Sequence, residues 1–116
     1  MRSSRQFRFL AAANGIGVVQ IVQPNQYYSQ KAFTDNERKI ALSRPADSPY
    51  RTAVAGGYRL LEAEPHPELI SAIKLYDAEG GDIYIDDCCH VNTRGETMLA
   101  EFVAARVAEW LAARKK

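Results

Sequence analysis

The sequence predicts an α/β fold with a parallel sheet, and three features indicate it. The run GVVQIVQP, from Gly17 to Pro24, is β-branched and almost continuously apolar, which is typical of a strand buried on both faces. The segment 6–13 before it has the pattern of a helix that stops at Asn14-Gly15. A helix that leads directly into such a strand is half of a βαβ crossover. A long amphipathic helix then closes the chain.

Composition and charge limit the classes of function. The chain has 116 residues, enough for one small domain but not two. Apolar residues make up 47% and charged residues 25%, as in an ordinary globular domain. The net charge of +1 indicates no excess of basic residues for binding nucleic acid, so we expect no nucleic-acid partner. The longest apolar run is too short for a membrane span. The start MRSSRQFRFLAAANG is interrupted by Arg8, so no signal peptide is predicted and the localisation stays open.

Capping patterns predict two helices in the middle of the chain. The polar and aromatic segment 25–33 is a predicted loop. Thr34 and Glu37 have the spacing of a capping box, which predicts a helix over 35–42. An N-cap candidate followed by proline predicts a second helix over 49–64, closed by the two prolines that follow it.

The last third of the chain contains one ambiguous segment and the clearest helix. Residues 69–73 fit either a strand or a helix, and 83–85 predict a short extended piece. Thr93 and Glu96 have capping-box spacing at the start of the final helix. One face of that helix then carries apolar residues at spacings of four, four and three, namely Leu99, Val103, Val107 and Trp110.

The stretch DDCCH, residues 86–90, carries the candidate catalytic site. Asp87 and His90 stand three positions apart, between an apolar run and the final helix. An imidazole takes a proton from a serine hydroxyl when a carboxylate fixes its tautomer and steadies its positive charge. Loops at the carboxyl ends of strands hold such groups in open α/β sheets. The alternative is a solvated loop in which Asp87 caps a turn and His90 is merely exposed. Asp86 stands four positions before His90 instead of three, so it is interpreted as a solvated residue.

The run from Ile83 onwards, IYIDDCCHVNTRGETMLAEFVAARVAEWL, resembles the C-terminal signature of the SGNH hydrolases, also called the GDSL esterase/lipase family. In that family an Asp-x-x-His pair is followed by a glycine and then by a helix that begins with apolar residues and alanine. Here the matching residues are Asp87, His90, Gly95 and Leu99-Ala100. The resemblance extends over 9–111 and is most specific at this motif. It implies an α/β fold, the C-terminal half of a flavodoxin-like three-layer α/β/α sandwich with a parallel sheet, with 1–116 as a single partial domain.

The resemblance also implies a chemistry, which is serine-dependent hydrolysis of carboxylic esters. His90 would be the general base toward the serine and then the acid toward the leaving alcohol, Asp87 would orient His90, and Gly95 would be structural. Small esters, lipids and acylated sugars are the implied substrates, and no metal or organic cofactor is implied. The family further requires a Gly-Asp-Ser-like segment with the nucleophile, a glycine in a second loop and a Gly-x-Asn segment, which together form the oxyanion hole.

Those three segments are not seen in the chain, so we expect them upstream in the gene or on another chain. The partners expected besides the ester substrate are therefore a complementing N-terminal half, or a second copy that associates through the exposed sheet edge. The chain by itself is expected to be marginally stable. The alternative functions are a non-catalytic remnant or partner-binding α/β fragment, and a small binding domain that only mimics the motif.

Other reactive or bulky side chains receive structural interpretations. Adjacent cysteines rarely form a disulfide with each other because the geometry is strained. Cys88 and Cys89 are therefore interpreted as small, partly buried side chains that fill space. A metal site made from these cysteines, His66 and His90 lacks separated ligand pairs, so none is expected. Further expectations concern packing: surface positions for Lys31 and Glu37, an exposed loop for His66, packing roles for Tyr27 and Tyr28, and a core position for Trp110.

Overall fold

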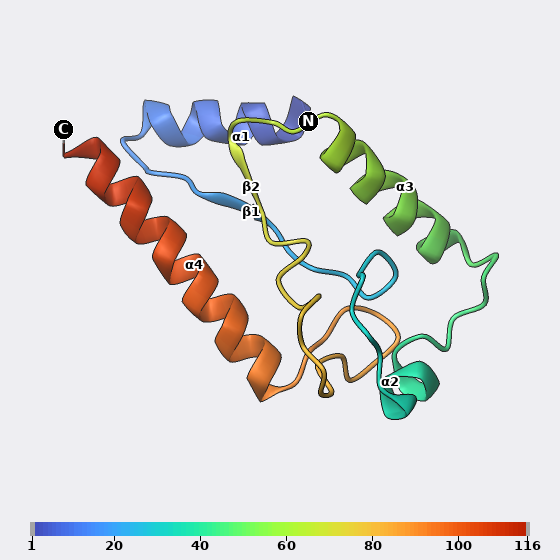
Figure 1. Ribbon diagram of the computed structural model, residues 1–116. Coiled ribbons are helices and arrows are strands. Elements are labelled where there is room, and N and C mark those ends of the chain that lie inside the picture. Colours follow the sequence, from blue (N-terminus) through green and yellow to red (C-terminus); the bar gives the residue numbers. More distant parts are fainter. Residues whose placement is uncertain (1, 116) are drawn as a thin grey trace.

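The computed structural model describes residues 2–115, and these combine helices with a small sheet (Figure 1). In chain order the elements are α1 (Arg2–Ala13), β1 (Gln20–Val22), α2 (Asp35–Ile40), α3 (Pro49–Ala63), β2 (Leu69–Ser71) and α4 (Thr93–Arg114). The predicted α/β class is confirmed at this level, because the described residues contain a two-stranded parallel sheet among helices. None of the helices described here combines the length and apolar character of a bilayer span.

The sheet is formed by β1 and β2, with Ile21 opposite Ile70 in parallel register. This pairing confirms a strand inside the 17–24 run and resolves the ambiguous 69–73 segment as a strand. The expectation that the first strand is buried on both faces is wrong here, since all three residues of β1 are only half-buried. In a two-stranded sheet each strand keeps one edge without a neighbour. Two helices reach this sheet through side chains: the Ser4 hydroxyl on α1 donates to the Gln20 side chain at 2.6 Å, and the Tyr58 hydroxyl on α3 donates to the Gln23 carbonyl at 2.9 Å.

Local signals set most of the helix ends. Thr34 and Glu37 form the predicted capping box: the Thr34 hydroxyl accepts from the Glu37 N–H, and the Glu37 carboxylate accepts from the Thr34 N–H. Gly15 adopts φ 68° just after α1, as its stop signal predicts. The N-cap of α4 is Asn92 and not Thr93, because the Asn92 side chain accepts from a free N–H of the first turn.

A small core lies between α2, the segment 72–84 and the first turn of α4. Tyr76 and Tyr84 meet edge to face with ring centres 5.7 Å apart, and the Tyr76 hydroxyl donates to the Gly95 carbonyl at 2.8 Å. The other apolar members of this cluster are Ala41 and Ile83, with Phe33, Leu75, Val91 and Met98 packed against it. The best-packed part of the molecule is therefore built mainly from loop segments.

Glu37 is the polar centre of this core, so the expectation that Lys31 and Glu37 lie at the surface is wrong. Both side chains are completely buried, and Lys31 Nζ lies 2.7 Å from Glu37 Oε2. Glu37 Oε1 accepts from the backbone N–H groups of Ile83 and Tyr84 at 2.8 and 3.0 Å. Burial raises the pKa of Glu37, but the hydrogen bonds from Lys31 and from three backbone N–H groups outweigh burial and leave that pKa lowered. We call Glu37, Lys31 and the buried cluster around them the Glu37 core.

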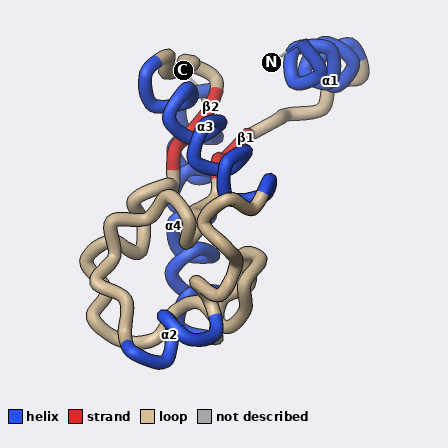
Figure 2. The backbone as a smooth tube through the Cα atoms, turned by 90° about the vertical axis from the view of Figure 1, so that its right-hand side faces the viewer, coloured by secondary structure: helices blue, strands red, loops and turns tan. Residues whose placement is uncertain are grey.

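Away from the Glu37 core, the molecule is loosely packed and exposes more surface than a compact chain. The accessible surface is 7824 Å², whereas a compact chain of this mass exposes about 6300 Å². The radius of gyration of 16.1 Å likewise exceeds the roughly 13 Å expected of a compact chain. Figure 2 shows α1 set apart from the rest, at the end of the extended segment that leads to β1. The large exposed apolar residues include Phe7, Phe9 and Leu10 on α1 and Leu111 on α4.

Candidate functional site

The DDCCH stretch forms a loop between the Glu37 core and α4. An antiparallel bridge between Tyr84 and Val91 closes the base of this loop, which confirms a short extended piece near 83–85. α4 begins two residues after the bridge. The loop is thus anchored on one side by buried core residues and on the other by a helix, as expected for a site that must hold its side chains still.

Asp86 organises this loop, so its interpretation as a merely solvated residue is wrong. Its Oδ1 accepts from the backbone N–H groups of Cys88, Cys89 and His90 at 2.9, 3.2 and 3.2 Å. Its Oδ2 makes a short contact with His90 Nδ1. The hydrogen bond with the imidazole, helped by the three N–H donors and opposed by a smaller effect of burial, lowers the pKa of Asp86 to about 2. Asp86 is therefore a carboxylate at neutral pH.

His90 is held by one ring nitrogen and exposed at the rest of its ring. Its side chain is 68% exposed, and Nδ1 is bonded to the Asp86 carboxylate. A carboxylate at Nδ1 favours the tautomer with the proton on that nitrogen, which leaves a lone pair on Nε2. The arrangement can therefore accept a proton at Nε2 and stabilise the imidazolium that results. Within the described chain no serine or cysteine is hydrogen-bonded to this ring.

Asp87, the expected partner of His90, points to a different residue. Its Oδ1 lies 3.4 Å from Arg44 Nη2, and its carbonyl accepts from Arg44 Nε at 2.8 Å. The Arg44 guanidinium in turn lies over the Tyr50 ring, 4.8 Å from its centre. The side-chain contact expected between Asp87 and His90 is not among the described hydrogen bonds: the turn wraps around Asp86 and brings that residue, four positions before the histidine, against the ring.

Three polar residues that the sequence analysis did not single out clamp the loop to the carboxyl end of β1. The buried Gln26 side chain donates to the Asp86 carbonyl at 3.1 Å. The Tyr50 hydroxyl donates to the Cys88 carbonyl at 2.6 Å and accepts from the Asn25 amide at 2.9 Å. Asn25 and Gln26 stand three and four residues beyond Val22, the last residue of β1, and polar residues after a strand end were the available signal. The candidate site thus lies at the edge of the sheet where α/β folds hold their ligands.

The two cysteines are free, with their Sγ atoms 3.5 Å apart. Burial, together with the neighbouring Cys88 thiol, raises the pKa of Cys89. A raised pKa keeps Cys89 protonated, which makes it a poor nucleophile. Among the described residues no group of three or more histidine, cysteine or acidic side chains could hold a metal ion.

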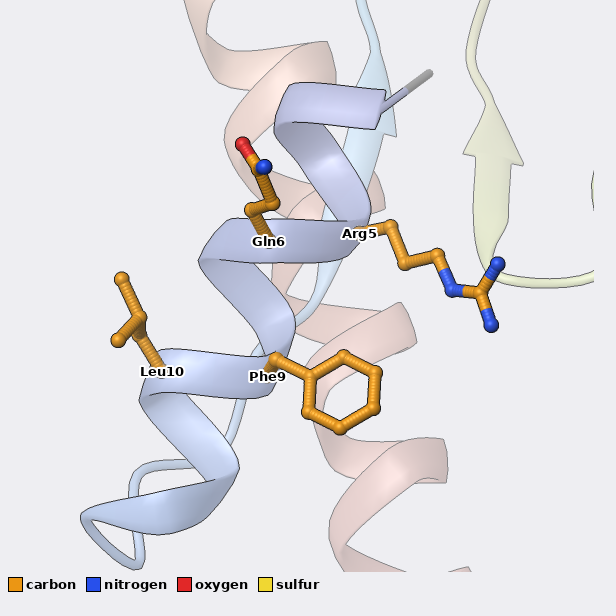
Figure 3. A pocket seen from close by; sticks show the side chains of 4 residues that line it. All are labelled: Arg5, Gln6, Phe9 and Leu10. Carbon is orange, nitrogen blue, oxygen red and sulfur yellow. The ribbon is translucent and has the colours of Figure 1, made fainter.

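Other sequence candidates lie away from the loop. His66 precedes β2, at the amino end of the strand, and its ring accepts from the Glu68 N–H at 3.2 Å. Tyr28 donates to Glu62 at 2.7 Å, and Tyr27 packs against the Tyr50 ring, so both pack as expected. Open hollows occur elsewhere on the molecule: Figure 3 shows one of about 590 Å³ on α1, lined by Arg5, Gln6, Phe9 and Leu10.

Comparison with known proteins adds no relative to these observations. No protein-family model matches the chain, and neither a curated protein nor a solved structure matches it. Membership of the SGNH hydrolases therefore stays a prediction from the motif around His90.

Proposed function

We propose that this chain supplies the acid–histidine part of a serine-dependent ester hydrolase of the SGNH type. The observation that supports this proposal best is the state of His90: its Nδ1 is bonded to an ionised carboxylate and its ring is exposed. In the proposed reaction, Nε2 accepts the proton of a serine hydroxyl that attacks an ester carbonyl. The imidazolium then returns this proton to the leaving alcohol. Small esters, lipids and acylated sugars are the proposed substrates.

Two carboxylates are candidates for the residue that orients the imidazole. The resemblance implies Asp87, whereas the contact with His90 favours Asp86. We assign the orienting role to Asp86, and we assign to Asp87 the anchoring of the loop through Arg44. The two assignments make different predictions for the two aspartate-to-asparagine variants.

The nucleophile and the oxyanion hole belong to segments outside these 116 residues in this proposal. The N–H groups of 88–90 already donate to Asp86, so they are not free to stabilise an oxyanion. By resemblance, the serine, glycine and asparagine segments would continue the parallel sheet at the free edge of β1. The result would be the three-layer α/β/α sandwich, with the missing half encoded upstream or carried by another chain.

The test uses the protein encoded by the full reading frame, assayed with p-nitrophenyl acetate and with a fluorophosphonate that labels activated serines. His90→Ala is expected to abolish both signals, while His66→Ala, the matched control, leaves them unchanged. Asp86→Asn is expected to lower the turnover number by about 10⁴-fold, as for the acid of other triads, with a much smaller loss in Asp87→Asn. The reverse order would transfer the orienting role to Asp87. Full activity in His90→Ala would exclude the hydrolase proposal.

A non-catalytic, partner-binding fragment is the second candidate function. The observation that favours it is the apolar surface that α1 and α4 expose. A full reading frame that gives no fluorophosphonate labelling, in a protein that is folded, would favour this candidate over the hydrolase.

A further inference from the structure

α4 carries an open apolar groove along most of its length. The groove has a volume of about 730 Å³, and its lining includes Leu99, Val103, Val107, Leu111, Ala100 and Ala104. These positions recur every three or four residues, so they form one continuous stripe of the helix. The stripe is open to solvent in part: Ala100, Ala104 and Leu111 are exposed, and Leu99, Val103 and Val107 are half-buried. Trp110, expected in the core, is only half-buried beside it.

The groove has a negative end and a positive end. Glu96 lines it in the first turn of α4, and Arg114 is the last residue of the helix. Eighteen residues separate the two, which is about five helical turns, so both lie on the same line of the helix about 27 Å apart. Both side chains are exposed, and the Arg114 guanidinium stacks on Trp110 at 4.3 Å from the ring centre.

This pattern of charge fits one arrangement of two α4 helices. When two copies lie antiparallel about a two-fold axis, Glu96 of each copy meets Arg114 of the other. The point midway between these residues, next to Ala104, is also the middle of the apolar stripe, so the charges and the apolar residues match in the same register. The alanines in the stripe allow the helix axes to approach closely. A parallel pair would instead bring Glu96 against Glu96 and Arg114 against Arg114.

The exposed area is large enough for such a contact. The surface exceeds that of a compact chain of this mass by about 1500 Å². A stable interface between two proteins buries about 800 Å² on each partner, so the excess, to which both α1 and α4 contribute, is larger than one such contact requires.

We propose that two copies of this chain form a dimer through an antiparallel pair of α4 helices. The interface consists of the apolar stripe at its centre and of two Glu96–Arg114 ion pairs at its ends. This interface lies on a helix. The sequence analysis instead predicts association through the exposed edge of the sheet. His90 and its loop are not part of this interface, so variants on the α4 stripe test the dimer separately from the proposed reaction.

The first experiment measures the mass of the 116-residue chain in solution by sedimentation over a range of concentrations. We expect a reversible monomer–dimer equilibrium. Ala104→Arg places a large charged side chain at the centre of the groove and is expected to give a monomer. Ala104 is exposed, so helix content by circular dichroism should stay unchanged in this variant. A wild-type chain that is monomeric throughout, or that forms only irregular aggregates, would overturn the proposal.

The second experiment tests the antiparallel register through charge reversal. Glu96→Arg and Arg114→Glu each turn two attractive pairs of the dimer into repulsive ones, so each should raise the dimer dissociation constant by about tenfold or more. Glu101→Arg is the matched control, since it makes the same charge change on α4 outside the groove and should leave the constant unchanged. Mixing Glu96→Arg with Arg114→Glu should restore dimerisation in the mixed pair. If Glu96→Arg behaves like Glu101→Arg, or if the mixture stays monomeric, the antiparallel dimer is excluded.

Discussion

The Glu37 core and the α4 groove are built from similar numbers of apolar residues, but they differ in what surrounds them. In the core, Glu37 links Lys31 to the backbone of Ile83 and Tyr84, and aromatic rings fill the space around it. Along α4, a regular apolar stripe is open to solvent in part. Regular amphipathic structure therefore does not by itself produce burial in this chain, whereas irregular segments joined by one polar residue do.

Stability and interaction are therefore divided between the two regions. Substitutions in the Glu37 core should change the free energy of unfolding strongly, because its atoms have no room to move. Substitutions on the apolar stripe of α4 that lines the groove should change association and leave the free energy of unfolding almost unchanged.

Replacing Glu37 by alanine should produce the largest loss. Lys31 would be left as a buried cation without its partner, and two backbone N–H groups would lose their acceptor. Removing one member of a buried ion pair typically costs about 3–5 kcal/mol. Urea denaturation should show this loss, while Asp35→Ala, at an exposed neighbour in the same helix, should change little. A loss below about 1 kcal/mol would mean that the pair does not hold the core together.

Protonation of Glu37 should remove part of the same stabilisation. Because its pKa is lowered in the folded protein, the contribution is complete above the unfolded pKa of about 4.3 and is lost as the pH falls through the lower folded value. Unfolding free energies measured between pH 7 and pH 3 should therefore fall at the acid end. Glu37→Gln should show a shallower fall than the wild type; equal slopes would contradict the assignment to this residue.

Gly95→Ala and Gly17→Ala compare the two regions directly. A Cβ at Gly95 would lie 2.7 Å from Val91 Cβ, an atom fixed to the backbone, so we expect a loss of about 1–3 kcal/mol. A Cβ at Gly17 would lie 2.0 Å from the tip of the Trp110 ring, but this atom is the far end of a half-buried side chain and not part of the backbone. We expect Gly17→Ala to cost less than about 1 kcal/mol and to change the tryptophan fluorescence.

The check for this pair is thermal unfolding together with fluorescence emission. Gly95→Ala should lower the melting temperature while the emission spectrum of the folded state stays close to that of the wild type. Equal losses in the two variants would show that the region around Trp110 is packed as tightly as the Glu37 core, and the contrast between the regions would fail.

Leu60→Ser should have the smallest effect. Leu60 lies on α3 and is 65% exposed, so the free energy of unfolding should change by no more than about 0.5 kcal/mol. Urea denaturation measures this change. A loss of several kcal/mol would show that α3 is covered by another molecule in solution, which would extend the interface beyond α4.

Much of the local structure followed from the sequence, because its causes are local. The capping box at Thr34 and the stop signal at Asn14-Gly15 were read correctly from neighbouring residues. The start of α4 was misread by one residue, since Asn92 and Thr93 are both good N-caps and only the fold decides between them. The burial of Glu37 could not be read in this way, because its backbone partners stand 46 and 47 residues away.

The sequence alone was enough to place the helices and the strand inside 17–24 and to indicate the DDCCH stretch as the candidate site, while it left 69–73 open between strand and helix. Periodicity and capping depend on residues within one or two turns of each other, and these are visible along the chain. Only the tertiary structure decided which aspartate contacts His90, that Asn25 and Gln26 clamp its loop, and that the apolar face of α4 stays open. These outcomes depend on contacts between distant segments, and on the small sheet, which leaves too little surface to cover every helix.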